Sequence, residues 1–165
     1  MSKTITIDIF NPESIRAAQR EIQAYKQWVI RKTEELAQRL AEYGVQRVEV
    51  GYAEALYDGD KDITYTVEQR GERSYAIVAS GKTVLFLEFG AGVIGEGHPL
   101  DGEFGYGPGT YPGQTHVPVP GFWWYTGSDG ESHFSRGNPP SMVMYQTSKE
   151  LRTELLRIAR EVFST

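Results

Sequence analysis

The chain has 165 residues, enough for one domain with a hydrophobic core, and its 39% apolar and 24% charged residues are typical of a soluble globular protein. The absence of cysteine excludes a disulfide framework, thiolate metal sites and a cysteine nucleophile. No apolar run is long enough for a signal peptide or a membrane helix. We therefore expect folding in a cytoplasm and no membrane partner.

The net charge of −5 is unevenly distributed along the chain. Residues 44–137 carry 13 acidic and 6 basic side chains, whereas the flanking segments are nearly balanced. Tight nucleic-acid binding needs a basic surface, because the phosphates must be neutralised. The sequence therefore predicts no stable nucleic-acid binding.

The first predicted elements are a strand and a long helix. Residues 3–10 alternate apolar and polar side chains, which predicts a short strand. Asn11-Pro12-Glu13 then supplies a helix cap, a proline at the first helical position and an early acid. An apolar residue recurs every seven positions from there on: Ile15, Ile22, Val29, Leu36 and Tyr43.

Gly44 is a typical C-terminal stop for such a helix, so the prediction is one helix over 12–43, about 45 Å long. That length exceeds what a domain of this size can cover. The helix packs either on its own sheet or partly on neighbouring subunits, and the sequence leaves both readings open.

Four segments rich in β-branched and aromatic residues follow: 46–52, 63–70, 73–80 and 82–89. Gly71 and Gly81 lie where hairpin turns are needed. Connections this short predict an antiparallel meander, since parallel crossovers need about a dozen residues or more.

Residues 90–140 are rich in glycine and proline, and only 122–126 is typical of a strand. So long a stretch without regular structure usually serves as a binding loop or an arm. Residues 142–163 predict a C-terminal helix. The predicted fold is a single α+β domain over 1–165. A mostly antiparallel sheet of four or five strands packs in it against the long N-terminal helix and the C-terminal helix.

Two motifs that suggest ligand binding lack the context they need. Residues 90–95 match G-x-G-x-x-G, but the glycines and prolines that follow forbid the helix on which a dinucleotide's phosphates would bind. Asp58, Asp60 and Asp62 resemble the start of a calcium-binding loop, yet the glycine and glutamate that such a loop requires are replaced by Ile63 and Gln69. We expect no cofactor.

Three histidines, His98, His116 and His133, lie in the glycine-rich region near several acids. Their spacing matches no zinc pattern, and no serine lies in a nucleophile-elbow context. The sequence thus predicts no catalytic or metal-binding residue. A weak metal site bridging subunits remains a minor alternative for the histidines.

The aromatic run Phe122-Trp123-Trp124-Tyr125 is the most unusual segment. In a strand it places Phe122 and Trp124 on one face and Trp123 and Tyr125 on the other. Either both faces pack in the core, or one of them contacts a second subunit or a partner. Two further aromatic residues are candidates for such an interface, Tyr106 and Tyr111.

The order of these elements resembles that of the minor capsid or tail-completion proteins of long-tailed bacteriophages and prophages. In that family, a strand ending in an acid, an aromatic residue and Gly-x-Gly precedes a variable loop, and a proline-rich segment introduces the last helix. The matching residues here are Glu88, Phe89, Gly90 and Gly92 in the first motif, and Pro139, Pro140 and Met142 in the second. The long aromatic stretch 93–137 departs from the family pattern.

The resemblance implies a structural, non-enzymatic virion subunit. It would form a homo-oligomeric ring, commonly of six copies, at the head–tail junction or the tail end, and would contact other neck or tail proteins. Its location would be the host bacterial cytoplasm during assembly and then the virion. Two alternatives stay open: a wall-active or other virion-associated enzyme that uses the histidine- and acid-rich loop, and a small soluble ligand-binding domain.

Overall fold

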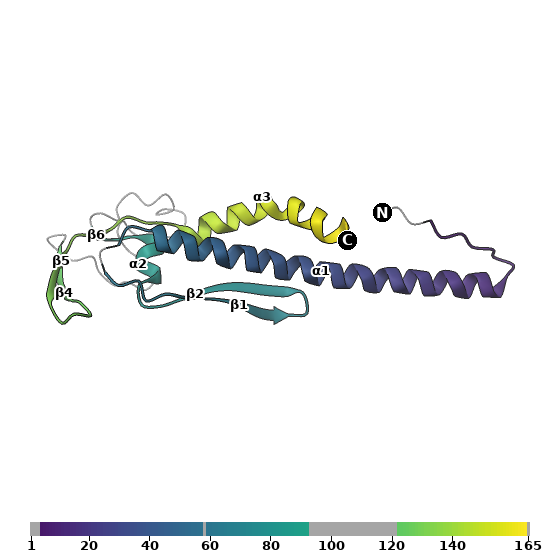
Figure 1. Ribbon diagram of the computed structural model, residues 1–165, viewed down its shortest axis with the longest axis horizontal. Helices are drawn as coiled ribbons and strands as arrows, with labels where there is room; N and C mark the ends of the chain where they lie inside the picture. Colours follow the sequence, from purple (N-terminus) through teal and green to yellow (C-terminus); the bar gives the residue numbers. More distant parts are fainter. Residues whose placement is uncertain (1–3, 58, 93–121, 165) are drawn as a thin grey trace.

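The computed structural model describes residues 4–57, 59–92 and 122–164. It is an elongated α+β structure built along one helix, α1 (Pro12–Glu54), that runs through most of its length (Figure 1). The other helices are α2 (Val84–Phe89) and α3 (Val143–Ser164). The strands pair as three antiparallel two-stranded sheets: β1 (Thr64–Gly71) with β2 (Ser74–Ser80), β3 (Ala91–Gly92) with β6 (Gly137–Asn138), and β4 (Trp123–Thr126) with β5 (Ser132–Ser135).

The predicted start of α1 is confirmed. Asn11 has an extended backbone, and its side-chain oxygen accepts hydrogen bonds from the N–H groups of Glu13 and Ser14. These bonds satisfy amides that have no partner within the helix.

The predicted end at Gly44 and the predicted strand 46–52 are wrong, because α1 continues for 43 residues, about 65 Å. Gly44 is a packing position inside the helix. A Cβ there would lie 2.2 Å from Ile77 Cδ1 of β2 and 3.2 Å from Leu151 Cδ1 of α3. The glycine lets two elements approach the helix backbone, and the chain after it stays helical because Val48 and Tyr52 are buried one turn apart.

The remaining strand predictions are correct only in part. Segments 63–70 and 73–80 form the β1–β2 hairpin, with a turn after Gly71 as predicted. Segment 82–89 instead holds α2, and residues 4–10 belong to no strand. The predicted sheet of four or five strands is therefore wrong for the described part of the chain.

The core lies around the second half of α1. Val48 and Tyr52 of α1 cluster with Leu87 of α2 and Val143 of α3. The face of the hairpin that carries Tyr65 packs against this cluster. Tyr65 stacks on Tyr52 with ring centroids 6.2 Å apart, within the usual range for aromatic pairs.

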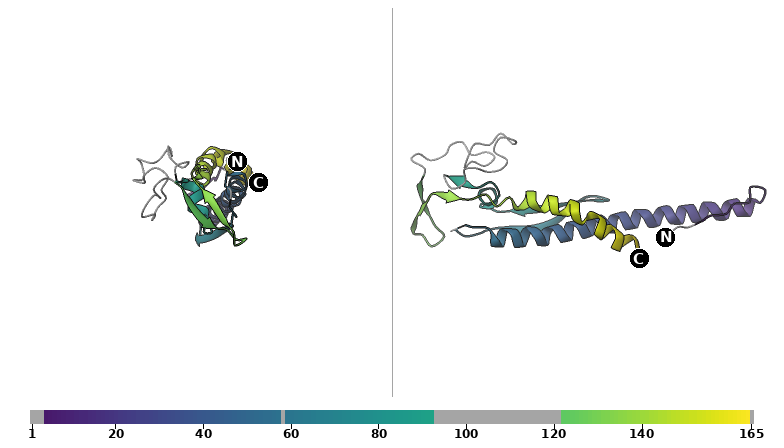
Figure 2. Two further views of the ribbon diagram at one scale, coloured as in Figure 1. Left: turned by 90° about the vertical axis from the view of Figure 1, so that its left-hand side faces the viewer. Right: turned by 90° about the horizontal axis from the view of Figure 1, so that it is seen from above.

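Helix α3 runs antiparallel to α1 and lies on the other side of it from the hairpin (Figures 1 and 2). Val143 contacts Gly51 near one end of α3, and Phe163 packs edge-on against Trp28 near the other, with ring centroids 5.6 Å apart. Between them, Glu150 accepts hydrogen bonds from Tyr43 (2.5 Å) and Arg47 (3.0 Å). Residues 12–27 of α1 project beyond both partners, and we call them the projecting segment.

If Gly44 is a packing glycine, Gly44→Val must push β2 or α3 away from α1. We expect a loss of about 1–3 kcal/mol in the free energy of unfolding, as for other overpacked cores. The control is Gln46→Val, the same β-branched residue at an exposed position of the same helix, which should change stability by no more than about 0.5 kcal/mol. Urea unfolding measures both, and equal values for the two variants would contradict the packing role.

Candidate functional site

The residues of the family resemblance meet at one junction, where the end of α2 lies against the start of α3. The key side chain is Glu88, which is 6% exposed. Its carboxylate accepts hydrogen bonds from the backbone N–H groups of Met144 (3.0 Å) and Tyr145 (3.2 Å) and from the Tyr52 hydroxyl (2.9 Å). One acid from α2 therefore caps α3 and ties both helices to α1.

Burial and the same carboxylate both act on the pKa of the Tyr52 hydroxyl. Burial raises the pKa of the Tyr52 hydroxyl first, and the neighbouring negative charge and hydrogen bond of Glu88 raise it further. Tyr52 therefore stays protonated and remains a hydrogen-bond donor to Glu88 at any physiological pH.

The chain on either side of Glu88 is held by backbone contacts. Gly90 has φ +76°, and a Cβ there would lie 2.9 Å from the Pro140 nitrogen and 3.0 Å from the Asn138 oxygen. Only glycine combines that left-handed backbone with so close an approach. Ser141 donates to the Leu87 carbonyl from both its N–H (2.8 Å) and its hydroxyl (2.6 Å).

Two more contacts complete the junction. Asn138 is buried and donates from its side-chain amide to the Phe86 carbonyl at 2.7 Å. Met142, with φ +52°, donates its N–H to the Glu88 carbonyl at 3.1 Å and precedes the first residue of α3. The residues singled out from sequence, Glu88, Phe89, Gly90, Gly92, Pro139, Pro140 and Met142, thus belong to one structural unit, although about 45 residues separate the two motifs.

Removing the capping acid should be costly, because it leaves buried donors without a partner. We expect Glu88→Ala to lower the free energy of unfolding by about 3 kcal/mol or more, and Tyr52→Phe by about 1.5–3 kcal/mol. Glu49→Ala is the control, since it removes an exposed carboxylate from the part of α1 that also carries Tyr52. Thermal and urea unfolding measure all three. Equal stability of the Glu88→Ala and Glu49→Ala variants would show that the cap does not hold the junction.

A second group of polar side chains surrounds a cleft of about 490 Å³ between residues 57–62 and the β4–β5 turn. Asp62 accepts hydrogen bonds from the N–H groups of Lys82 and Thr83 and from the Thr83 hydroxyl, and these bonds hold the pKa of Asp62 below its usual value. This acid therefore fastens the loop before β1 to the start of α2.

The remaining acids of the cleft are also engaged. The Glu131 N–H and then His133 lower the pKa of Asp129, and the His133 Nε2 lies 2.9 Å from Asp129 Oδ2. Ser128 donates to Asp60 and not to His133, so the serine and the histidine form no nucleophile–base pair. Among the described residues, no three acids or histidines are grouped to hold a metal ion. Asp58, His98 and His116 lie outside them.

The predicted aromatic strand exists as β4, and it pairs with β5, which the sequence analysis missed. Phe122, Trp124 and Phe134 form an aromatic cluster, with ring centroids 5.3 Å apart for Phe122–Phe134 and 5.6 Å for Trp124–Phe134. The three side chains are 40%, 64% and 52% exposed, respectively. This face of the hairpin is therefore not buried in the core that the described residues form.

The other face of the β4–β5 hairpin carries Tyr125, which stacks on His133 at 5.4 Å. The Trp123 side chain, Tyr106 and Tyr111 lie outside the described residues. A sequence signal for the missed strand did exist: Gly127-Ser128-Asp129-Gly130 is a turn-rich run between two short segments with aromatic residues.

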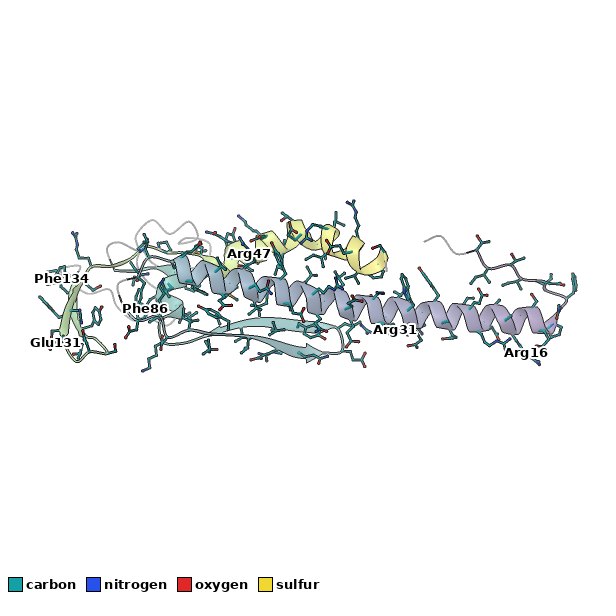
Figure 3. The ribbon with its side chains drawn as sticks, viewed as in Figure 1. Arg16, Arg31, Arg47, Phe86, Glu131 and Phe134 are labelled. Atoms are coloured by element: carbon teal, nitrogen blue, oxygen red, sulfur yellow. The ribbon has the colours of Figure 1, made fainter. Side chains whose placement is uncertain are left out.

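Apolar side chains are also exposed at the opposite end of the molecule. Ile15, Ile22 and Tyr25 are exposed on the projecting segment, and Phe10 precedes it almost fully exposed. Figure 3 shows Arg16 near this end and Phe134 at the far end. Two apolar surfaces thus lie at the two ends of the elongated molecule.

No family model, curated protein or solved structure matches this chain. Within the described ranges, no helix has the length and apolar character needed to cross a membrane.

Proposed function

We propose that the protein is a structural subunit of a tailed-phage or prophage particle. It assembles with further copies of itself into a ring at the head–tail junction or the tail end, and docks there on other neck or tail proteins. The proposal has two parts: that the protein acts by assembly, and that the assembly is a phage neck or tail.

The assembly part rests on one observation, the aromatic cluster Phe122, Trp124 and Phe134 on the β4–β5 hairpin. Three adjoining rings that are about half exposed form a contiguous apolar patch, whereas single exposed apolar residues are ordinary. Aromatic side chains are also the residue type that contributes most to protein interfaces.

The phage part rests on the resemblance. Its two motifs form one unit around Glu88, and they flank residues 93–121, which the sequence predicts to belong to a long loop. In the family, that loop is the variable part between the same two motifs. The acidic middle segment agrees with a channel through which DNA passes without binding, because like charges repel.

The aromatic cluster supplies the test. Phe122→Ser/Trp124→Ser should leave the melting temperature nearly unchanged, because both side chains are already exposed. The same change should weaken self-association by about thirtyfold or more, since truncating an interfacial tryptophan costs about 2 kcal/mol or more. Leu56→Ser is the control, because Leu56 is an exposed apolar residue outside the hairpin.

Sedimentation across a range of concentrations measures the association, and negative-stain microscopy shows whether the oligomers are rings. A wild-type chain that stays monomeric and forms no ring at high concentration would contradict the assembly role. Oligomers unaffected by the double substitution would remove the aromatic cluster from the interface.

A further inference from the structure

The N-terminal segment, residues 4–10, has the composition of a strand but lacks a sheet. Thr4, Thr6 and Asp8 alternate with Ile5, Ile7 and Ile9, and five of these six residues are β-branched. The segment folds back along the projecting segment (Figure 1). Its hydrogen bonds to other described residues lie at its root, where Asp8 N–H donates to Ser14 Oγ at 2.9 Å and Asn11 N–H to the Asp8 carbonyl at 3.2 Å.

Much of the segment lacks backbone hydrogen bonds and buried side chains within its own subunit. The backbone of residues 4–7 makes no hydrogen bond to another described residue. Ile7 is 48% exposed and Ile9 is 71% exposed. The segment therefore carries both free backbone groups and free apolar side chains, the two features that a sheet edge accommodates.

The β1–β2 hairpin offers such an edge. Figure 1 shows β1 as the strand further from α1, and among the described residues β1 pairs with β2 alone, so no described strand lies beside the outer edge of β1. Two-stranded sheets are marginally stable and gain from a third strand.

The side-chain pattern of the edge matches that of the segment. On β1, Tyr65 faces the core, whereas Thr64 and Thr66 are exposed on the other face. A strand added with Ile5, Ile7 and Ile9 on the core side would extend the apolar layer over α1. Its Thr4, Thr6 and Asp8 would then extend the polar layer.

A chain cannot place this segment along its own hairpin. Ile77 marks the middle of the hairpin and lies against Gly44, 32 residues from Pro12 along α1, or about 48 Å. Residues 4–11 span at most about 29 Å when fully extended. The strand donor must therefore be a second copy.

We propose that the N-terminal segment of one subunit adds as a third strand to the outer edge of β1 in a neighbouring subunit. This inference rests on the proposed assembly and identifies one contact between its copies. Addition of an extended segment to an exposed sheet edge is a recurrent mode of association, because the main chain of the segment supplies hydrogen bonds along that edge.

Cysteine cross-linking tests the contact directly, since the natural chain contains no cysteine. One chain carries Thr6→Cys, and a second carries Thr64→Cys or Thr66→Cys on the matching polar face. The control is Thr6→Cys mixed with Arg152→Cys, an exposed position on α3. After mixing and mild oxidation, the yield of covalent dimers for one of the two β1 positions should be at least several times the yield for the control. Yields equal to that control would overturn the proposal, as would a Thr6→Cys/Thr66→Cys chain that cross-links only within itself.

Paired substitutions test the side-chain pattern without covalent bonds. Ile5→Asp/Ile7→Asp should weaken self-association at least tenfold, whereas Thr4→Asp/Thr6→Asp, which alters only the polar side, should change it less than about threefold. If the wild-type chain forms rings and the isoleucine variant forms them equally well, strand exchange is excluded and the proposed function stands. A wild-type chain that stays monomeric contradicts both the strand addition and the proposed function.

Discussion

The buried carboxylate of Glu88 is the interaction on which the arrangement of helices depends. Helix α3 is preceded by Met142, whose side chain has no oxygen that could accept a hydrogen bond from the first N–H groups of the helix. The acid from α2 supplies the missing acceptors and reaches the Tyr52 hydroxyl of α1 as well. A negative charge in this place is favourable, since it faces the positive end of the α3 dipole and three donors. Without it, two backbone N–H groups at the start of α3 and the buried Tyr52 hydroxyl would lose their acceptor.

The start of α1 and the β1–β2 hairpin could be predicted because their signals are local. A capping asparagine before a proline, and a glycine between two alternating segments, act within a few residues. Gly44 misled the prediction because its role depends on residues more than 30 positions away. Its missing side chain admits Ile77 and Leu151, and nothing in the neighbouring sequence distinguishes a packing glycine from a helix stop.

The prediction of a strand over 82–89 was wrong for a similar reason. Its β-branched and aromatic residues favour a strand, but Asp62 and Glu88 make it a short helix through contacts with distant elements. For the candidate site, the residues could be predicted but their arrangement could not. The motif residues were predicted from the resemblance in the order of elements, whereas their meeting around one carboxylate follows only from the three-dimensional structure. Phe134 went unnoticed because its strand is four residues long and its partner strand lies across a turn.

The continuous course of α1 has a mechanical consequence. A single helix of about 65 Å that is clamped over its second half acts as a stiff lever. The free end lies about 48 Å from Gly44, so a tilt of about 5° at the clamp moves that end by about 4 Å, close to the spacing between neighbouring strands. The fit of Ile77 and Leu151 against a bare backbone therefore sets the position of a surface that neither residue touches. Small changes in the packing of the core would therefore displace the far end of the helix by several ångströms.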